Sequence, residues 1–363
     1  MPTRLRRAAA LSLLMILSGC EGDTQSRSST VDSAVAEDAG LSVNDRGIQT
    51  NDRGVPTIDA ESSATDAEDP GPDTIEDANP PSTTDAARPD LGVPPVADAS
   101  TPPSMRNLRE GPQEFTITER IDGEDVNRLV IIHAPEDLDE DVSYPVVFAF
   151  HGFGGRPQSF VNQLRRLVNE HNFVGVYPQG HQESWNLGAE PSTADELAFV
   201  DQIMEHLSEY RQLQGTRRVG FGTSNGAGMI HTLAANTRHF EAVAALSTAL
   251  IVGREPGENA GPVSVLQVHG MRDELCPYDG GESRVGHTFH SAEESIRLWA
   301  VHNGCDEDPQ RLNTDQDNLR IEYRGCREET RVIHYGIRGA GHGFPGNTEG
   351  GVIDLALDFL GVL

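Results

Sequence analysis

The sequence predicts an α/β protein in which a mostly parallel sheet is covered by helices on both faces and is preceded by a disordered acidic segment. From about residue 111 to residue 363, short apolar runs alternate with amphipathic helical patterns, which is typical of a parallel sheet covered on both sides. Some of these runs, such as 145–150, are continuously apolar, as in strands buried on both faces. Residues before 111 have neither pattern.

The expected elements follow one another in a regular order. Residues 115–121 and 126–134 predict an opening pair of strands, and 145–150 predicts the first buried strand. A helix is expected over 157–171, where Phe160, Leu164 and Val168 recur at helical spacing. The other expected strands are 173–177, 217–222, 242–246, 263–269 and 331–337, and the other expected helices are 194–210, 227–235, 292–302 and one from about 353. Together they predict one domain, 111–363.

Residues 1–20 have the composition of an export signal. Arg4, Arg6 and Arg7 precede an apolar run at 8–17, which is shorter than the ~20 residues that a membrane-spanning helix needs. The end of the run, Leu17-Ser18-Gly19-Cys20, resembles the lipobox of bacterial lipoprotein signals, which implies a lipid on Cys20. We therefore expect an exported protein, either a cell-envelope lipoprotein held at the membrane by this lipid or an extracellular one. The alternative is an ordinary signal peptide in which Cys20 is incidental.

Residues 21–110 predict a disordered acidic linker. The segment is rich in Ser, Thr, Asp, Ala, Gly and Pro, and residues 21–105 contain no Phe, Tyr or Trp. Such a chain cannot bury enough apolar surface to offset its ordering entropy. We interpret it as a tether between the membrane and the domain; a spacer without selected length is the alternative.

The charge of the whole chain excludes one class of partner. It contains 57 acidic and 28 basic residues, for a net charge of -29, and every basic residue is arginine. A surface this acidic repels phosphate backbones, so nucleic acid is not an expected partner.

One motif carries a specific chemistry. Gly222-Thr223-Ser224-Asn225-Gly226 matches Gly-x-Ser-x-Gly and lies between the expected strand 217–222 and the expected helix 227–235. In this context the motif is typical of the α/β-hydrolase fold, where the serine occupies a strained strand-to-helix turn. Ser224 is therefore the predicted nucleophile.

A serine nucleophile needs a histidine base and an acid that orients it. In this fold the acid and the histidine follow the serine, each in a loop after a later strand. Asp273 follows strand 263–269 and His342 follows strand 331–337, so they are the predicted partners. Glu274 and Asp279 are nearby alternatives for the acid.

Two backbone N–H groups are expected to bind the oxyanion. One belongs to Asn225, directly after the nucleophile, and the other to Phe153 in the loop His151-Gly152-Phe153-Gly154-Gly155. The glycines of this loop would otherwise form only a tight turn. The chain has no His-x-x-x-His pair with a following carboxylate, so we expect neither a metal nor a cofactor.

Taken in order, the motifs resemble a known family. They are His151 to Gly155, Ser184-Trp185-Asn186, Gly222 to Gly226, His269 to Gly281, and Gly341 to Gly346. This set is similar to the poly(3-hydroxybutyrate) depolymerase and feruloyl esterase-like family of α/β-hydrolase serine esterases.

The resemblance implies an ester substrate, either a polyester oligomer or a plant-polysaccharide ester, and the triad Ser224, Asp273 and His342. It also implies that Trp185 and Asn186 are substrate-binding residues beside the cleft, with a buried core tryptophan as the alternative, and that Cys305 and Cys326 form a disulfide. The chain departs from the family in having no cysteine just after Asn186, and the role of Cys276 stays open.

Ester hydrolysis through an acyl-enzyme is the leading hypothesis. A serine peptidase would share the triad, but no tripeptide-binding insertion is evident. A non-catalytic binding lipoprotein on the same fold is the third alternative, and it would not need candidates at all three triad positions.

Overall fold

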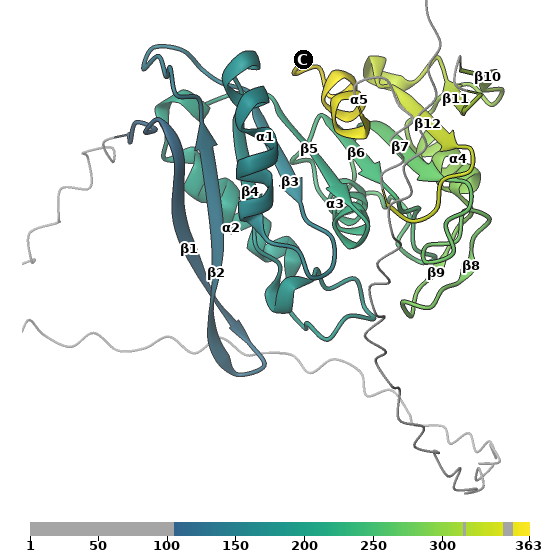
Figure 1. The fold of residues 1–363 in the computed structure, drawn as a ribbon, viewed down its shortest axis with the longest axis horizontal. Coiled ribbons are helices and arrows are strands. Elements are labelled where there is room, and N and C mark those ends of the chain that lie inside the picture. Colours follow the sequence, from purple (N-terminus) through teal and green to yellow (C-terminus); the bar gives the residue numbers. More distant parts are fainter. Residues whose placement is uncertain (1–104, 315–316, 344–350) are drawn as a thin grey trace, which may run out of the picture. The chain divides into compact units, whose positions relative to one another are not determined.

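The computed structural model describes residues 105–314, 317–343 and 351–363 (Figure 1). Ten strands form one sheet in the order β1-β2-β4-β3-β5-β6-β7-β12-β11-β10. These strands are β1 (Gly111–Ile121), β2 (Glu124–Ala134), β3 (Val146–Phe150), β4 (Val174–Pro178), β5 (Arg218–Thr223), β6 (Ala242–Leu246), β7 (Ser264–Gly270), β10 (Gln310–Asn313), β11 (Leu319–Tyr323) and β12 (Val332–Ile337). The helices are α1 (Pro157–His171), α2 (Glu196–Ser208), α3 (Asn225–Asn236), α4 (Ala292–His302) and α5 (Val352–Phe359).

The centre of the sheet is parallel. Strands β4, β3, β5, β6, β7 and β12 pair in parallel, whereas the β1–β2 pair at one edge and the β11–β10 pair at the other are antiparallel. Every residue of β3 and β6 is buried, because helices cover both faces of these central strands. The predicted mostly parallel α/β sheet is confirmed.

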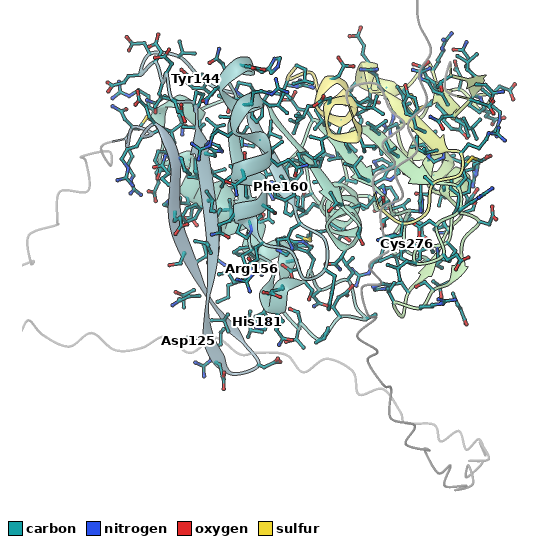
Figure 2. The ribbon with its side chains drawn as sticks, in the orientation of Figure 1. Asp125, Tyr144, Arg156, Phe160, His181 and Cys276 are labelled. Atoms are coloured by element: carbon teal, nitrogen blue, oxygen red, sulfur yellow. A yellow bond between two sulfur atoms is a disulfide. The ribbon has the colours of Figure 1, made fainter. Side chains whose placement is uncertain are left out.

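Each face of the sheet has its own apolar core. Helices α1 and α5 pack on one face, and helices α2, α3 and α4 pack on the other. On the first face the ring of Phe160 of α1 packs against the rings of Tyr177 and Phe221, with centroids 5.7 and 5.6 Å apart. Asp125, in contrast, projects from the turn end of the β1–β2 pair (Figure 2). The alternation of side chains along each strand therefore supplies both cores at once.

Four strands were not predicted from the sequence. The hairpin β10–β11 extends the sheet beyond β12, and β8 (Gly281–Glu282) pairs with β9 (Thr288–Phe289) as a separate two-stranded sheet. The sequence pattern missed β10 because it lies at the edge and is largely exposed, and β8 and β9 have two residues each. A disulfide joins Cys305 and Cys326 around the β10–β11 hairpin, as the family resemblance implies.

The N-terminal predictions concern residues of which little is described. The signal peptide, Cys20 and the linker as far as residue 104 lie outside the described residues. From residue 105 onward the chain contacts the domain: Leu108 is buried, and its N–H donates to the side chain of Gln212. Within the described parts of the chain, no helix has the length and hydropathy needed to cross a bilayer.

The loops that carry chemistry all leave the same edge of the sheet. Ser224 follows β5, Asp273 follows β7, and His342 follows β12. The loop 151–155 follows β3. Because these four strands are parallel, their carboxyl ends meet at one edge, where α/β sheets build their sites.

Candidate active site

Ser224 lies on a strained turn between β5 and α3. Its backbone has φ 52° and ψ -118°, a conformation that residues other than glycine rarely adopt. A Cβ on Gly222 would lie 1.9 Å from the carbonyl oxygen of Gly226, and one on Gly226 would lie 2.1 Å from that of Phe150. Only glycine fits at both positions, so the motif follows directly from the close approach of helix and strands.

His342 connects Ser224 to Asp273 by two hydrogen bonds. Its Nε2 lies 2.8 Å from Ser224 Oγ, and its Nδ1 lies 2.8 Å from Asp273 Oδ2. The serine is 118 residues from His342 in the chain, and Asp273 is 69 residues from it. The geometry is that of a nucleophile, a base and an orienting acid.

The loops of Asp273 and His342 are held together by their backbones. The N–H of Arg272 donates to Ala340 O at 2.7 Å. A Cβ on Gly270 would lie 2.3 Å from the carbonyl oxygen of Gly341, so the end of β7 must be glycine for the two loops to approach this closely.

The structure brings Asp273, and neither alternative carboxylate, to His342. Asp273 has no exposed side-chain surface, whereas Glu274 and Asp279 are exposed. Burial by itself would raise the pKa of Asp273, but hydrogen bonds from His269, His342 and the Cys276 amide hold it well below its usual range. Asp273 is therefore ionised at neutral pH.

The ionised Asp273 in turn acts on His342. The hydrogen bond to Asp273, with a smaller contribution from the Cys276 side chain, raises the pKa of His342 from 6.5 to about 9, and burial opposes this rise only in part. The imidazolium that forms when His342 takes a proton is thus stabilised.

The two predicted oxyanion donors flank the serine. Asn225 is the first residue of α3, where a helix has backbone N–H groups without an intrahelical acceptor. The loop that carries Phe153 lies against the turn, because a Cβ on Gly152 would be 3.5 Å from Ser224 Cβ. Both predicted donors therefore belong to segments that lie next to Ser224.

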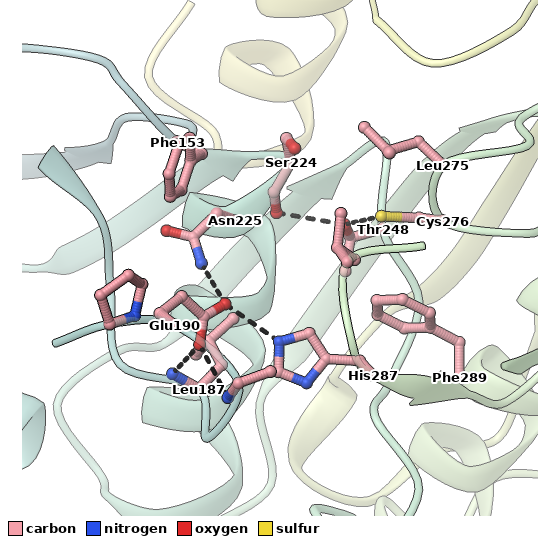
Figure 3. Close-up of a pocket in the computed structure, with 13 residues that line it drawn as sticks. Phe153, Leu187, Glu190, Ser224, Asn225, Thr248, Leu275, Cys276, His287 and Phe289 are labelled. Carbon is pink, nitrogen blue, oxygen red and sulfur yellow. Dashed lines mark hydrogen bonds and ion pairs between the residues drawn. The ribbon is translucent and has the colours of Figure 1, made fainter. Parts of the chain in front are cut away.

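A pocket of about 330 Å³ opens at Ser224. Figure 3 shows its walls, which are mostly apolar. The lining residues are Phe153, Leu187, Ala189, Glu190, Pro191, Ser224, Asn225, Thr248, Leu275, Cys276, Val285, His287 and Phe289. The side chain of Phe153 is 68% exposed and forms part of the apolar rim.

Glu190 and His287 are the polar pair of this pocket, and the sequence analysis missed both. Glu190 Oε1 accepts from Asn225 Nδ2 at 2.8 Å and lies 2.9 Å from His287 Nε2 (Figure 3). Its Oε2 accepts from the N–H of Leu187 at 2.7 Å. Burial by itself would raise the pKa of Glu190, but the hydrogen bonds from His287 and Leu187 lower it overall. No local motif marks either residue, since they are 97 positions apart.

Trp185 lies outside the pocket, contrary to the substrate-contact role that the resemblance implies. Its side chain has no exposed surface, so it cannot touch a substrate in this structure. Its indole Nε1 donates to His151 O at 2.8 Å, and its backbone N–H donates to Asn225 Oδ1 at 2.7 Å. Trp185 is the core tryptophan of the alternative interpretation, and it supports the two loops around the serine.

Asn186 is likewise held by the protein itself. Its side-chain amide donates to Ala194 O at 3.0 Å, and its backbone N–H donates to Glu196 Oε1 at 3.0 Å. The other oxygen of Glu196 pairs with buried Arg128 at 2.7 Å. Asn186 thus anchors the loop between β4 and α2 rather than lining the pocket.

Cys276 is the free cysteine of the described residues. It is buried and lines the pocket beside Ser224. The hydroxyl of Thr248 donates to its sulfur at 3.5 Å (Figure 3). Cys20, the predicted lipidation site, lies outside the described residues.

Comparison with known proteins finds feruloyl esterases among the relatives by sequence, and no family model matches the chain. The chain is 28% identical over 219 residues to a probable feruloyl esterase C of Aspergillus terreus and 27% identical over 218 residues to feruloyl esterase C of Emericella nidulans. Each match covers 57% of this chain and 74% of the relative. Feruloyl esterase B of Piromyces equi is 25% identical over 229 residues, or 59% of this chain and 42% of its own.

Among solved structures, the fold is similar to that of an acetyl xylan esterase from Aspergillus awamori. The TM-score is 0.50 at 16% identity, and the match covers 69% of this chain and 100% of the other. At this identity the similarity concerns the fold.

Proposed function

We propose that this chain, a carboxylic ester hydrolase related to the feruloyl esterases and built on the α/β-hydrolase fold, cleaves its substrate with a Ser224–His342–Asp273 triad. The observation that carries this proposal is the pair of 2.8 Å contacts that joins the three side chains. They connect a strained, otherwise weak nucleophile to a base, and that base to a buried anion.

The reaction proceeds through an acyl-enzyme. Ser224 Oγ attacks the ester carbonyl carbon while its proton moves to His342 Nε2, and the carbonyl oxygen becomes an oxyanion that accepts from the N–H groups of Phe153 and Asn225. Collapse of this intermediate breaks the ester bond, and His342 gives the proton to the leaving alkoxide, which departs as the alcohol. Water then attacks the acyl-enzyme, transferring one proton to His342, and the acid is released as Ser224 recovers its proton.

The pocket indicates the class of acyl group. Its walls are largely apolar and its volume is about 330 Å³, which suits an acyl group larger than acetyl. With feruloyl esterases as its relatives, we infer a hydroxycinnamoyl ester such as a ferulate as substrate. A panel of methyl ferulate, p-nitrophenyl acetate, p-nitrophenyl butyrate and hydroxybutyrate oligomers tests this; the inference fails if methyl ferulate is not hydrolysed while the smaller acyl esters are.

The triad is tested at Ser224. Ser224→Ala removes the nucleophile, so kcat for an activated ester should fall by about 10⁶-fold, the loss seen when a serine nucleophile of this kind is removed. Circular dichroism and thermal unfolding should remain close to wild type, because one hydroxyl on a turn contributes little to the core. A folded Ser224→Ala protein with wild-type turnover would contradict the proposal.

We also propose that the enzyme is exported and held at a membrane by a lipid on Cys20. The support is the sequence of residues 1–20, in which three arginines and a short apolar run precede Leu17-Ser18-Gly19-Cys20. The acidic residues 21–104 then separate the lipid from the catalytic domain.

A further inference from the structure

A second histidine contacts the acid of the proposed triad. His269, near the end of β7, places its Nε2 3.1 Å from Asp273 Oδ2, the same oxygen that bonds to His342. Neither His269 nor Asp273 has any exposed side-chain surface. Because solvent does not reach this hydrogen bond, its electrostatic interaction is stronger than that of the same contact in water.

The contacts of His269 define where its proton lies. Its Nε2 faces two acceptors, Asp273 Oδ2 and the carbonyl oxygen of Cys276 at 2.9 Å. Only a protonated Nε2 satisfies both oxygens, so His269 donates to Asp273 from Nε2. Asp273 Oδ2 therefore accepts from two imidazoles at once.

A second buried histidine, His231 of α3, is a neighbour of His269. Trp299 Nε1 donates to His231 Nδ1 at 3.1 Å, so His231 carries its own proton on Nε2. Burial, and secondarily the neighbouring His269, lowers the pKa of His231 to about 3, and the ring is neutral. His231 Nε2 and His269 Nδ1 are both buried without a hydrogen-bond partner among the described residues, so the two rings do not bond to each other.

The remaining groups around His269 do not compete for Asp273. The ring of Tyr278 lies edge-on to His269, with centroids 5.6 Å apart. The hydroxyl of Tyr278 bonds instead to His334 Nε2 at 2.9 Å, and His334 Nδ1 lies 3.2 Å from Gln267 Nε2. His334, like His231, has its pKa lowered to about 3, mainly by burial, so the rings that surround His269 bring no positive charge.

We propose that His269 is a positioning residue for Asp273, and that it limits how strongly Asp273 holds the proton of His342. The proposal rests on the triad function proposed above. A donor that shares Oδ2 takes up part of its negative charge. Without His269, that charge acts on His342 alone, so His342 keeps its proton to higher pH and less of the neutral base is present at neutral pH.

The test compares the pH profiles of His269→Phe and His269→Gln. Phenylalanine keeps the ring volume and removes the donor, whereas a glutamine amide can still donate to both Asp273 Oδ2 and Cys276 O. In His269→Phe the acidic limb of kcat/KM should move up by about one pH unit, which lowers kcat/KM at neutral pH about tenfold and leaves the alkaline plateau near wild type. His269→Gln should return the acidic limb of kcat/KM to its wild-type pH.

Two further variants keep the test decisive. Rates are expressed per Ser224 titrated with a fluorophosphonate probe, so that unfolded protein does not count. If His269→Phe does not fold, His269→Leu removes the same donor to Asp273 with a smaller side chain and should move the limb in the same direction. His133→Phe is the matched control, because His133 is a fully buried histidine of the same sheet, on β2, and should leave the limb in place.

The outcomes separate this inference from the proposed function. A limb that stays in place or moves to lower pH, or a loss of equal size at every pH, would overturn the positioning role. If Asp273→Asn itself retains full activity, the triad is wrong and the positioning role falls with it. If Asp273→Asn loses most of its activity while His269→Phe, or His269→Leu in its place, behaves like His133→Phe, only the inference fails.

Discussion

The carboxylate of Asp273 accepts four hydrogen bonds, two on each oxygen. His269 and His342 bond to Oδ2, and the N–H groups of Leu275 and Cys276 donate to Oδ1. A carboxylate with this many donors stays ionised and cannot rotate. The backbone after β7 therefore fixes the position of the charge on which the proposed chemistry at Ser224 depends.

The choice of Asp273 among three nearby carboxylates can be tested directly. Asp273→Asn removes the charge that stabilises the imidazolium of His342, and turnover should fall by up to ~10⁴-fold, as for the equivalent change in a serine protease. Glu274→Gln is the matched control, since Glu274 is the next residue and is exposed. Steady-state kinetics on an activated ester measure both. If Glu274→Gln lost most of its turnover while Asp273→Asn kept most of it, the assignment of Asp273 as the acid would be wrong.

The pH dependence of turnover follows from the raised pKa of His342. Only the neutral imidazole takes the Ser224 proton, so kcat/KM declines as the pH falls through the pKa of His342 in the free enzyme. That pKa is raised from 6.5 to about 9, so the midpoint of the acidic limb should lie well above 6.5. Rates of a soluble ester, measured across the pH range in which the protein stays folded, check this. A midpoint at or below 6.5 would show that burial outweighs the charge of Asp273.

At the scale of elements, two segments far apart in the chain meet at the pocket wall. The loop between β4 and α2 carries Glu190, and the turn between β8 and β9 carries His287, whose side chains are 9% and 7% exposed. Their contact joins both segments to Asn225 at the start of α3. The carboxylate of Glu190 thus holds in place both the pocket wall and Asn225, one of the proposed oxyanion donors.

Replacing the carboxylate of Glu190 should therefore disturb both the pocket wall and the position of Asn225. A glutamine at position 190 has only one acceptor oxygen for the donors of Asn225, His287 and Leu187, so at least one of them loses its partner. Glu190→Gln should lower kcat/KM about tenfold to a hundredfold, since small misplacements of a donor cost this much, and lower the midpoint of thermal unfolding. Kinetics and a thermal melt measure the two effects.

Glu136→Gln supplies the comparison for Glu190. Glu136 pairs with Arg165 on the surface, where both side chains are at least half exposed, and such pairs contribute little to stability. Its kinetics and melting midpoint should match wild type. If Glu190→Gln behaves in the same way, the carboxylate has no role in shaping the site.

At the scale of the whole molecule, the acidic chain and its N-terminus bear on where the enzyme acts. The net charge of -29 favours solubility and repels anionic surfaces. A chain of this charge would not adhere to an acidic membrane by its surface. A covalent lipid would hold it near the membrane, and an acidic linker would keep the domain at a distance.

Membrane attachment through Cys20 has a direct test. The full-length protein, expressed in a bacterial host, should partition into the detergent phase and carry lipid mass at its N-terminus. Cys20→Ser should abolish the lipid and release the protein or block its processing, while Cys276→Ser, which alters a buried cysteine of the domain, should leave partitioning unchanged. A wild-type protein that is wholly soluble and carries no lipid would rule out the anchor.

The sequence by itself determined the order of the main elements and the positions of Ser224 and His342. The periodicity of apolar residues is a local property, and helices α1 and α4 and strand β6 begin and end where it predicts. The glycines around Ser224 are equally local, because their absent side chains make room for atoms a few residues away or on the adjacent strand. The chain order of serine, acid and histidine then follows from the fold.

Only the tertiary structure decided which side chains meet. It selected Asp273 over Glu274, placed Trp185 in the core, and brought Glu190 to His287 and His269 to Asp273. It also paired β10 and β11 at an edge whose exposed residues carry no continuous apolar pattern. These outcomes depend on contacts such as Glu190–His287, 97 positions apart in the chain, and no spacing rule along a strand or helix extends that far.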